Sequence, residues 1–191
     1  MSTDTNHPRA LALVGMPGAG KTLCAHHLEE LGYFQLRFGG VVEGEVRQRG
    51  WNVNPENERI VREELRKEHG MAAMAKVLLP KLKSALSDHS HIVMDGLYSF
   101  SEYKVLHAEL GVPMVVVAIV ASRQLRYERL ASRSIRPLTP QEAEQRDLQE
   151  IETLEKGGPI AIADYTLLNN TSTEDLLNQL DNLLALLKFT P

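Results

Sequence analysis

The residues best suited to chemistry lie near the N-terminus, where residues 15–22 have the sequence GMPGAGKT. This segment matches G-x-x-x-x-G-K-[ST] at every fixed position. Its glycines leave successive backbone amides free to turn toward one anion, because no Cβ atom stands in the way. The segment therefore predicts a phosphate loop made of Gly15, Met16, Pro17, Gly18, Ala19, Gly20, Lys21 and Thr22.

Two side chains of this phosphate loop and one distant carboxylate are candidates for the chemistry itself. Lys21 would reach the terminal phosphates of a nucleotide, and Thr22 would offer its hydroxyl to a magnesium ion. Such an ion usually has a carboxylate nearby, at the end of another buried strand. Asp95 follows the apolar run Ile92–Met94 and is the candidate, although Asp-Gly is also an ordinary turn signal.

Arginines gather later in the chain, where residues 121–136 hold five of them and a single acid. The spacing of Arg126, Arg129 and Arg133 places neighbouring pairs on one face of a helix. Phosphoryl transfer depends mainly on positioning and on neutralising charge. We therefore expect Arg129, Arg133 and Arg136 to act in catalysis; the alternative is a solvated basic face.

The elements that must position these residues alternate short apolar runs with longer amphipathic ones. This alternation is typical of an α/β fold with a parallel sheet, and near-continuous apolar runs indicate strands that are buried on both faces. The phosphate loop would then join the first strand to a helix, as the motif requires. The expected strands are Ala10–Val14, Tyr33–Arg37, His91–Met94, Met114–Val120 and Tyr165–Leu168.

Helix signals are dense between the second and third expected strands. Asn54 followed by Pro55 predicts a helix that runs toward Glu68 and breaks at Gly70. A second helix is expected over Met71–Leu86. One crossover needs less helix than this, so the surplus predicts a substrate-binding segment.

Two later helices have capping signals at their first residues. The run Thr139–Glu142 contains a capping box and a helix-starting proline, and this helix should end near residues 157–159. The last helix is capped at either Thr171 or Ser172. Its apolar stripe, which predicts core packing, consists of Leu176, Leu180, Leu183, Leu184 and Leu187.

Composition bounds the remaining possibilities. The chain has 191 residues, of which 43% are hydrophobic and 24% charged, and its net charge is -4. These values predict one globular domain over residues 1–191 and give no reason to expect a nucleic-acid partner. The single cysteine, Cys24, excludes an internal disulfide and a Cys-rich zinc site. The apolar run Val112–Val120 is too short to cross a membrane, and Met1–Pro8 lacks the apolar core of a signal peptide. We therefore expect a cytoplasmic protein, a monomer or homodimer, with no membrane partner.

With the phosphate loop, Asp95 and the arginines in this order, the chain resembles the P-loop kinases of the nucleoside monophosphate kinase group. That group includes adenylate kinase and dephospho-CoA kinase, and the chain looks most like small adenylate-kinase-related proteins of archaea and bacteria. The resemblance runs from Leu11 to about Leu187. It implies a three-layer α/β sandwich with five parallel strands in the order 2-3-1-4-5, an acceptor-binding helical segment over residues 38–88, and an arginine-rich lid over residues 133–146.

The resemblance also implies roles for particular residues, with ATP and Mg²⁺ as cofactors. The phosphate loop would hold ATP, and Thr22 and Asp95 would support the metal. Arg129, Arg133 and Arg136 would be lid arginines, and Arg146 corresponds to an arginine that follows the lid. Near the adenine, the resemblance places Asn169 at the end of the last strand and a stacking guanidinium at Arg126.

The chain departs from the family on the acceptor side. Where related proteins have a Gly-Asp-Val-Val-Arg type of run, it has Gly39–Glu43, with Gly40 for the aspartate and Glu43 for the arginine; where they have a second arginine after strand three, it has Tyr98. A phosphate beside Glu43 would be repelled, so a plain nucleoside monophosphate fits poorly.

Several interpretations of the acceptor side stay open. The missing arginines could be replaced by Arg47, Arg62 or Arg66. Alternatively, the acceptor is a hydroxyl compound that Glu43 or Glu45 binds or deprotonates. Tyr98 could stack on a base, whereas Glu43 could simply face solvent.

These observations predict an ATP- and Mg²⁺-dependent phosphotransferase that acts on a small nucleotide-like acceptor. The alternative is a regulatory or adaptor NTPase with a degenerate acceptor site and slow ATP hydrolysis. A GTP switch is disfavoured, because the chain has no Asn-Lys-x-Asp run.

Overall fold

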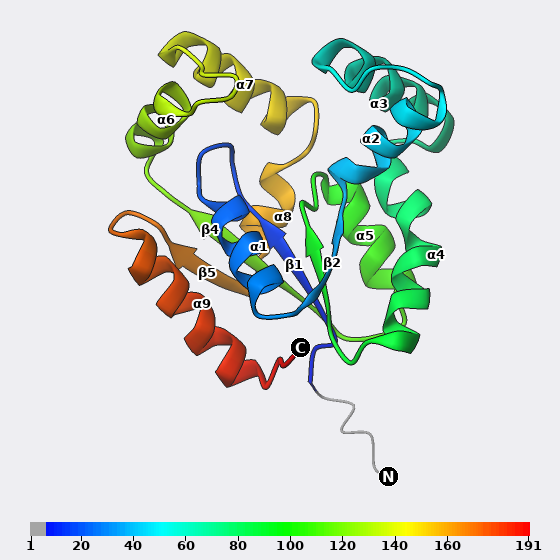
Figure 1. The fold of residues 1–191 in the computed structure, drawn as a ribbon, viewed down its shortest axis with the longest axis vertical. Helices are drawn as coiled ribbons and strands as arrows, with labels where there is room; N and C mark the ends of the chain where they lie inside the picture. The colour runs from blue at the N-terminus through cyan, green and yellow to red at the C-terminus, as the bar shows by residue number, and fades with distance from the viewer. Residues whose placement is uncertain (1–6) are drawn as a thin grey trace.

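Five parallel strands form one sheet in the computed structural model, which describes residues 7–191 (Figure 1). The sheet order is β2-β3-β1-β4-β5, which confirms the predicted α/β fold and the order 2-3-1-4-5. The prediction that Met1–Pro8 is not a signal peptide falls mostly outside the described residues. The strands are β1 Ala10–Val14, β2 Phe34–Arg37, β3 Ile92–Asp95, β4 Met114–Val120 and β5 Tyr165–Leu168.

Two strands differ from the expected ones by a residue at three of their ends: β2 starts one residue later, and β3 both starts and ends one residue later. Strand β2 begins at Phe34, and Tyr33 just before it packs in the core and stacks on Phe189. Strand β3 extends to Asp95, whose backbone is in register with both Leu13 and Arg37. The candidate metal-side carboxylate is therefore the last residue of a central strand.

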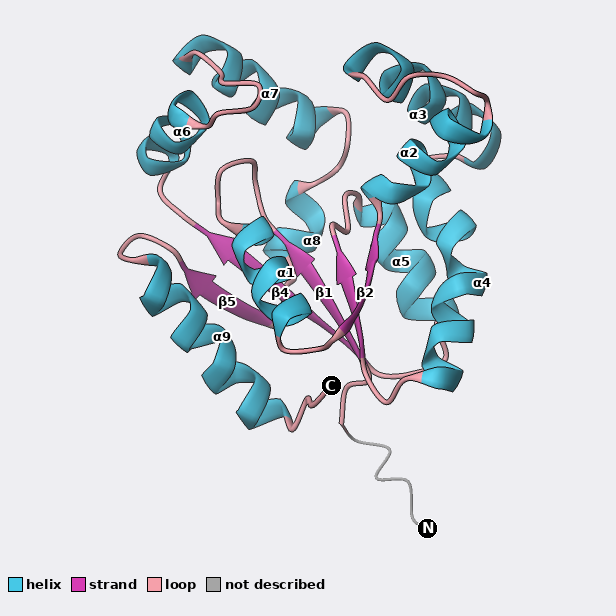
Figure 2. Cartoon of the chain, in the orientation of Figure 1, coloured by secondary structure: helices cyan, strands magenta, loops and turns pink. Residues whose placement is uncertain are grey.

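Alternation along β1 divides the core into two layers, because successive side chains point to opposite faces of a sheet. Ala10, Ala12 and Val14 face the layer that contains the helices between β2 and β4. Leu11 and Leu13 face the layer that contains helix α1 (Lys21–Glu30) and helix α9 (Thr173–Leu187). Figure 2 shows α1 and α9 on one side of the strands and α4 and α5 on the other.

Three helices form the segment between β2 and β3. They are α2 Gly39–Gln48, α3 Pro55–His69 and α4 Ala73–Asp88. Asn54 caps α3 by accepting a hydrogen bond from the Asn57 amide at 2.9 Å, and α3 ends before Gly70 as expected. The surplus of helix at this point is thus real, and it stands beside the carboxyl ends of the strands (Figure 1).

Helix α5 (Phe100–Glu109) follows β3, and three helices lie between β4 and β5: α6 Arg123–Ser132, α7 Pro140–Glu152 and α8 Gly157–Ala161. The expectation that α7 runs to residues 157–159 was wrong. Pro159 lies in the first turn of α8, where a missing amide breaks no helical bond. A Cβ on Gly158 would lie 2.6 Å from Phe100 Cβ, so glycine permits α8 to pack on α5.

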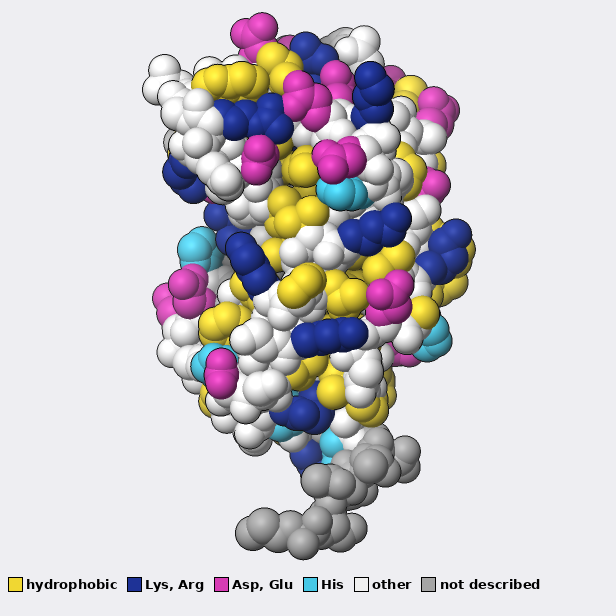
Figure 3. Space-filling model, turned by 90° about the vertical axis from the view of Figure 1, so that its right-hand side faces the viewer, with side chains coloured by type: hydrophobic (Ala, Val, Ile, Leu, Met, Phe, Trp, Pro, Cys, Tyr) yellow, Lys and Arg dark blue, Asp and Glu magenta, His cyan; other side chains and the backbone are white. Residues whose placement is uncertain are grey.

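Of the two possible caps of α9, the structure uses Ser172, which forms a capping box with Asp175. The leucine stripe packs in the core as expected, with Leu187 only partly buried. None of the helices within residues 7–191 is long and apolar enough to cross a membrane. On the face shown in Figure 3, Lys and Arg side chains alternate with acidic and hydrophobic ones.

Burial along α9 leads to a first prediction. Leu180 is fully buried, whereas Leu186 on the same helix is 69% exposed. Leu180→Ala should lower the free energy of unfolding by about 2–5 kcal/mol, because it removes buried methyl groups and leaves a cavity. Leu186→Ala should change it by less than about 0.5 kcal/mol. Urea denaturation of the two variants checks this, and equal losses would contradict the packing of α9.

Glu102, in the capping box of α5, leads to a pH prediction. Its Oε2 accepts hydrogen bonds from the Tyr98 and Ser99 amides at 2.8 and 3.1 Å, while its Oε1 is buried without a hydrogen-bond partner. Burial raises the pKa of Glu102 from 4.5 to about 7. An acid with a raised folded-state pKa favours folding at low pH, and this contribution is lost as the pH rises from about 4.5 to about 7.

We therefore expect Glu102→Gln, which still accepts both bonds, to gain stability relative to wild type as the pH rises through that window. The gain should be on the order of 3 kcal/mol, the equivalent of the pKa shift. Unfolding free energies of both proteins at about pH 5 and about pH 8 measure it. A difference that does not change with pH would show that Glu102 does not titrate in this way.

Candidate nucleotide and acceptor site

The phosphate loop joins β1 to α1, as the sequence predicts, and two of its glycines have backbone conformations that favour glycine. Gly18 has φ 79° and Gly20 has φ 107°. A Cβ on Gly18 would lie 2.7 Å from the backbone oxygen of Arg126, and one on Gly20 would overlap the Asn169 amide nitrogen. The loop is therefore pressed between α6 and the end of β5, with its amides and the α1 N-terminus available to an anion.

Lys21 and Asp95 meet at the carboxyl edge of the sheet. The Lys21 ammonium donates a hydrogen bond to Asp95 Oδ1, and Arg37 Nε lies 3.7 Å from Asp95 Oδ2. Arg37 ends β2, Asp95 ends the adjacent strand β3, and Lys21 belongs to the phosphate loop after β1. These three neighbouring strands bring the groups together. Sequence analysis missed Arg37, although its place at the end of the strand next to Asp95 was a usable signal.

The residues expected to support magnesium fit such an ion. Thr22 is exposed at the start of α1, and its hydroxyl makes no hydrogen bond within residues 7–191. Asp95 supplies a hard carboxylate oxygen, which Mg²⁺ prefers together with phosphate oxygens. Thr22 and Asp95 would therefore hold the metal once a nucleotide is bound.

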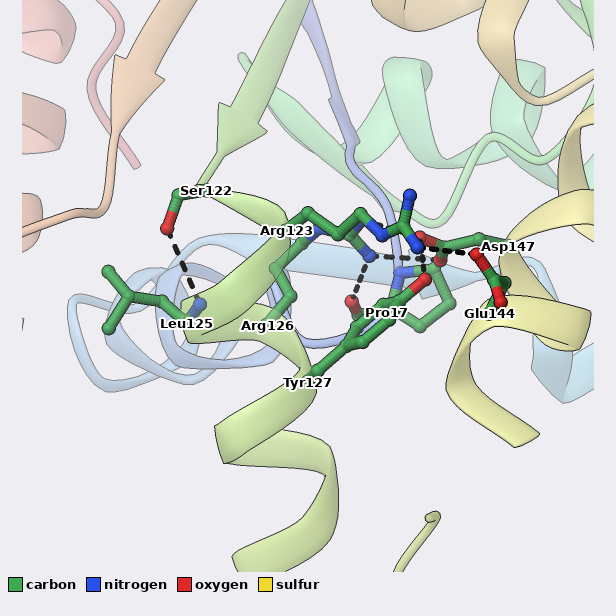
Figure 4. Close-up of polar contacts among 8 residues, drawn as sticks. All are labelled: Pro17, Ser122, Arg123, Leu125, Arg126, Tyr127, Glu144 and Asp147. Carbon is green, nitrogen blue, oxygen red and sulfur yellow. Dashed lines mark hydrogen bonds and ion pairs between the residues drawn. The ribbon is translucent and has the colours of Figure 1, made fainter. Parts of the chain in front are cut away.

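Arg126 on α6 connects the phosphate loop to α7 (Figure 4). Its guanidinium donates to the Pro17 carbonyl at 3.0 Å and to both oxygens of Asp147 on α7 at 2.9 and 2.5 Å. Arg126 and Asp147 are both buried. Bidentate pairing of this kind fixes geometry as well as charge. Sequence analysis did not identify Asp147.

Asn169 and Arg129 hold the other side of the phosphate loop. The buried Asn169 side chain donates to the Ala19 carbonyl at 2.9 Å, and Arg129 donates to the Asn169 carbonyl at 3.0 Å. Arg129 also reaches the Gly18 carbonyl at 3.5 Å. The guanidinium of Arg126 and the amide of Asn169 thus bind the loop itself, and their expected contacts with adenine stay predictions.

Arg133, the next lid arginine, lies close enough to Arg136 and Arg146 to be affected by their positive charges. Burial, together with the charges of Arg146 and Arg136, lowers the pKa of Arg133, and one of its terminal nitrogens is buried without a partner. Arg133 Nε donates to the Arg136 carbonyl. Arg136 has φ 53°, and its guanidinium lies 3.7 Å from Glu58 on α3. The positive charge of these arginines would attract an anion. The pair of Arg136 and Glu58 also connects the segment after α6 with helix α3.

A cavity of about 790 Å³ lies between these arms, the helices α2 and α3 on one side and α7 on the other. Its walls include the predicted residues Glu43, Arg62, Tyr98 and Arg146. Arg47 does not line the cavity; it lies 3.6 Å from the Glu43 carboxylate and helps to hold it. Figure 1 shows the two arms rising on opposite sides of the carboxyl edge of the sheet.

Glu43 and Tyr98, which both line the cavity, each lie beside a charged side chain. Arg37 donates to Glu43 Oε1 at 3.3 Å, so Glu43 neutralises an arginine beside Asp95. Burial raises the pKa of Tyr98 to about 12, which keeps its phenol neutral. Lys156 lies 5.0 Å from the centroid of the Tyr98 ring.

Lys156 and Glu150 form a buried pair that sequence analysis missed. Lys156 Nζ donates to Glu150 at 2.6 Å, and Arg146 Nε lies 3.6 Å from the same carboxylate. Burial lowers the pKa of Lys156. Glu150 thereby fixes Arg146 at the cavity wall.

Comparison with solved structures supports the fold. The chain is similar to TT1252 from Thermus thermophilus, with a TM-score of 0.65, 19% identity, and coverage of 97% of this chain and 100% of that one. It is also similar to the shikimate kinase of Bacteroides thetaiotaomicron, with a TM-score of 0.59, 15% identity, and coverage of 94% and 98%. At these identities the likeness shows the P-loop kinase-like fold alone.

Sequence comparison gives nearer relatives. The chain is 36% identical to a UPF0200 protein of Hyperthermus butylicus, over 94% of this chain and 95% of the relative. It is 34% identical to the UPF0200 protein MJ1399 of Methanocaldococcus jannaschii, over 91% and 88%. A family model described as an AAA domain matches residues 11–163. The chain therefore belongs to the AAA domain family of P-loop proteins and, within it, groups with the UPF0200 proteins.

Proposed function

We propose that this protein is an ATP- and Mg²⁺-dependent phosphotransferase that acts on a small nucleotide-like acceptor. One observation carries the proposal: Arg37, which lies 3.7 Å from the Asp95 carboxylate that Lys21 binds, lines the same cavity as the lid residues Arg136 and Arg146. A switch or adaptor needs a nucleotide site, but it has no need for a charged cavity of about 790 Å³ next to it. The resemblance to adenylate kinase and dephospho-CoA kinase supports the same class.

The proposed reaction moves the terminal phosphoryl group of ATP to an acceptor hydroxyl. The bond between the γ-phosphorus and the bridging oxygen of ADP breaks, and a bond to the acceptor oxygen forms. The acceptor proton passes to a carboxylate at the sheet edge, Asp95 or Glu43, and then to water. The metal, when bound, neutralises charge on the phosphates.

The chain's own residues supply position and charge for this transfer. Lys21 and the loop amides would bind the phosphates that leave with ADP. Arg133, Arg136 and Arg146 would bind the oxygens of the moving group, where negative charge must be neutralised. Because the chain has Glu43 and Tyr98 where related proteins have arginines for a reacting phosphate, the proposed acceptor presents a neutral hydroxyl at this end of the cavity.

Lys21→Ala tests the assignment. We expect phosphotransfer to fall by about 100-fold or more, because the variant loses a charged donor to the phosphates. ADP release from Mg-ATP should be measured with nucleoside monophosphates, nucleosides and dephospho-CoA, and with no acceptor. Stimulation by one acceptor class that is absent in Lys21→Ala supports a kinase.

The same assay separates the alternative function. Slow ADP release that no acceptor stimulates would instead support a regulatory or adaptor NTPase, for which the glutamate at position 43 is the motivating observation. Full activity of Lys21→Ala would exclude both.

A second prediction concerns the support of the phosphate loop. Asn169→Ala removes the donor to the buried Ala19 carbonyl and should weaken Mg-ADP binding about tenfold, since an unpaired buried carbonyl costs about 1–3 kcal/mol. Asn178→Ala, at an exposed position of α9, is the matched control. Calorimetric titration measures both, and unchanged affinity in Asn169→Ala would mean that the loop keeps its shape without this bond.

A further inference from the structure

The arginines that line the cavity differ in whether they have a partner. Most of them lie beside a carboxylate of the cavity wall, which offsets their charge. The pairs and their shortest separations are Arg37 with Glu43 at 3.3 Å, Arg59 with Glu63 at 2.9 Å, Arg136 with Glu58 at 3.7 Å, and Arg146 with Glu150 at 3.6 Å.

Arg62 and Arg66 also line the cavity, but within residues 7–191 neither makes an ion pair or a side-chain hydrogen bond. They are four residues apart on α3 and therefore share one face of that helix. The Nε atom of Arg66 is buried without a partner. Burial lowers the pKa of Arg66; the charges of Glu102 and Glu150 oppose this shift, and the charge of Arg62 adds to it. Two guanidinium groups on one helix face thus line the cavity together.

We infer that Arg62 and Arg66 form a subsite for a phosphate monoester group carried by the acceptor. This inference rests on the proposed function and names the class of its substrate: a small molecule with a hydroxyl at one end and a phosphate monoester at the other. A phosphate monoester carries nearly two negative charges at neutral pH, which matches two guanidinium groups. Guanidinium groups also bind phosphate oxygens in pairs of hydrogen bonds.

The position of α3 assigns this phosphate to the far end of the acceptor. Helix α3 packs on α2 and α4, and Figure 1 shows it beyond α2 as seen from the phosphate loop. The reacting end of the cavity contains Arg37 and Glu43 beside Asp95. There Arg37 and Lys21 already lie beside Glu43 and Asp95, whereas on α3 two arginines that make no ion pair within residues 7–191 can attract a phosphate.

The unpaired arginines also replace what the sequence lacks. The arginines expected at positions 43 and 98 would hold a phosphate that reacts, and the chain has Glu43 and Tyr98 instead. In this chain the cavity arginines that make no ion pair within residues 7–191 lie on α3, and Glu43 and Tyr98 stand at the two positions where arginines were expected. An acceptor whose phosphate binds but does not react fits this arrangement.

Direct binding tests the subsite separately from catalysis. The phosphate loop is first filled with saturating Mg-ADP, because it would otherwise bind phosphate itself. Ribose 5-phosphate and ribose are then titrated calorimetrically into wild type, into the double variant Arg62→Gln with Arg66→Gln, and into Lys67→Gln. Lys67 is an exposed residue of the same helix and does not line the cavity, so it controls for charge and for folding.

We expect ribose 5-phosphate to bind wild type and Lys67→Gln with equal affinity and to bind the double variant at least about tenfold more weakly. Ribose should bind at least about tenfold more weakly than its phosphate. Equal binding to the double variant, equal binding of ribose, or no binding of ribose 5-phosphate would overturn the subsite. Because these outcomes need no phosphotransfer, they are distinct from a failure of the proposed function, which only the ADP-release assay reports.

Discussion

The carboxylate of Asp95 is the point on which the rest of the site depends. It ends a central strand in register with Leu13 and Arg37, so the phosphate loop after β1 and the end of β2 both converge on it. Lys21 binds one of its oxygens and Arg37 lies near the other. Parallel strands make this convergence possible, because their carboxyl ends share one edge. In the proposed reaction, nucleotide and acceptor would meet at this edge.

A second constraint holds α6 and α7 next to that edge. The buried pair of Arg126 and Asp147 ties α6 and α7 to the Pro17 carbonyl, so the base of the lid cannot shift without moving the phosphate loop. At its far end the lid approaches α3 through Arg136 and Glu58. A buried pair resists removal of either partner far more than an exposed one does. The segment after β4 therefore has a buried anchor at its base and one partly exposed ion pair at its tip, which fits the lid role in the proposed function.

The strands and the phosphate loop were predictable because their signals are local or belong to a fixed motif, whereas the strand order followed from the family resemblance. Three of the observed ends of β2 and β3 differ from the expected ends by one residue. For the cap of α9, the structure uses one of the two residues that the sequence offered. The supporting residues were not predictable, since Asp147, Glu150 and Lys156 are ordinary charged residues until folding buries them together. Gly157 and Gly158 resembled a break and instead open α8, because only packing on Phe100 reveals why glycine is needed there.

Transfer of the terminal phosphoryl group is the central claim, and its most direct measurement follows that group itself. Mg-ATP labelled in the γ-phosphate would be incubated with the protein and each hydroxyl acceptor that bears a phosphate monoester, and the products separated. The account predicts label in a new phosphate ester in amounts equal to the ADP formed. Label found only in inorganic phosphate, whatever acceptor is present, would contradict it.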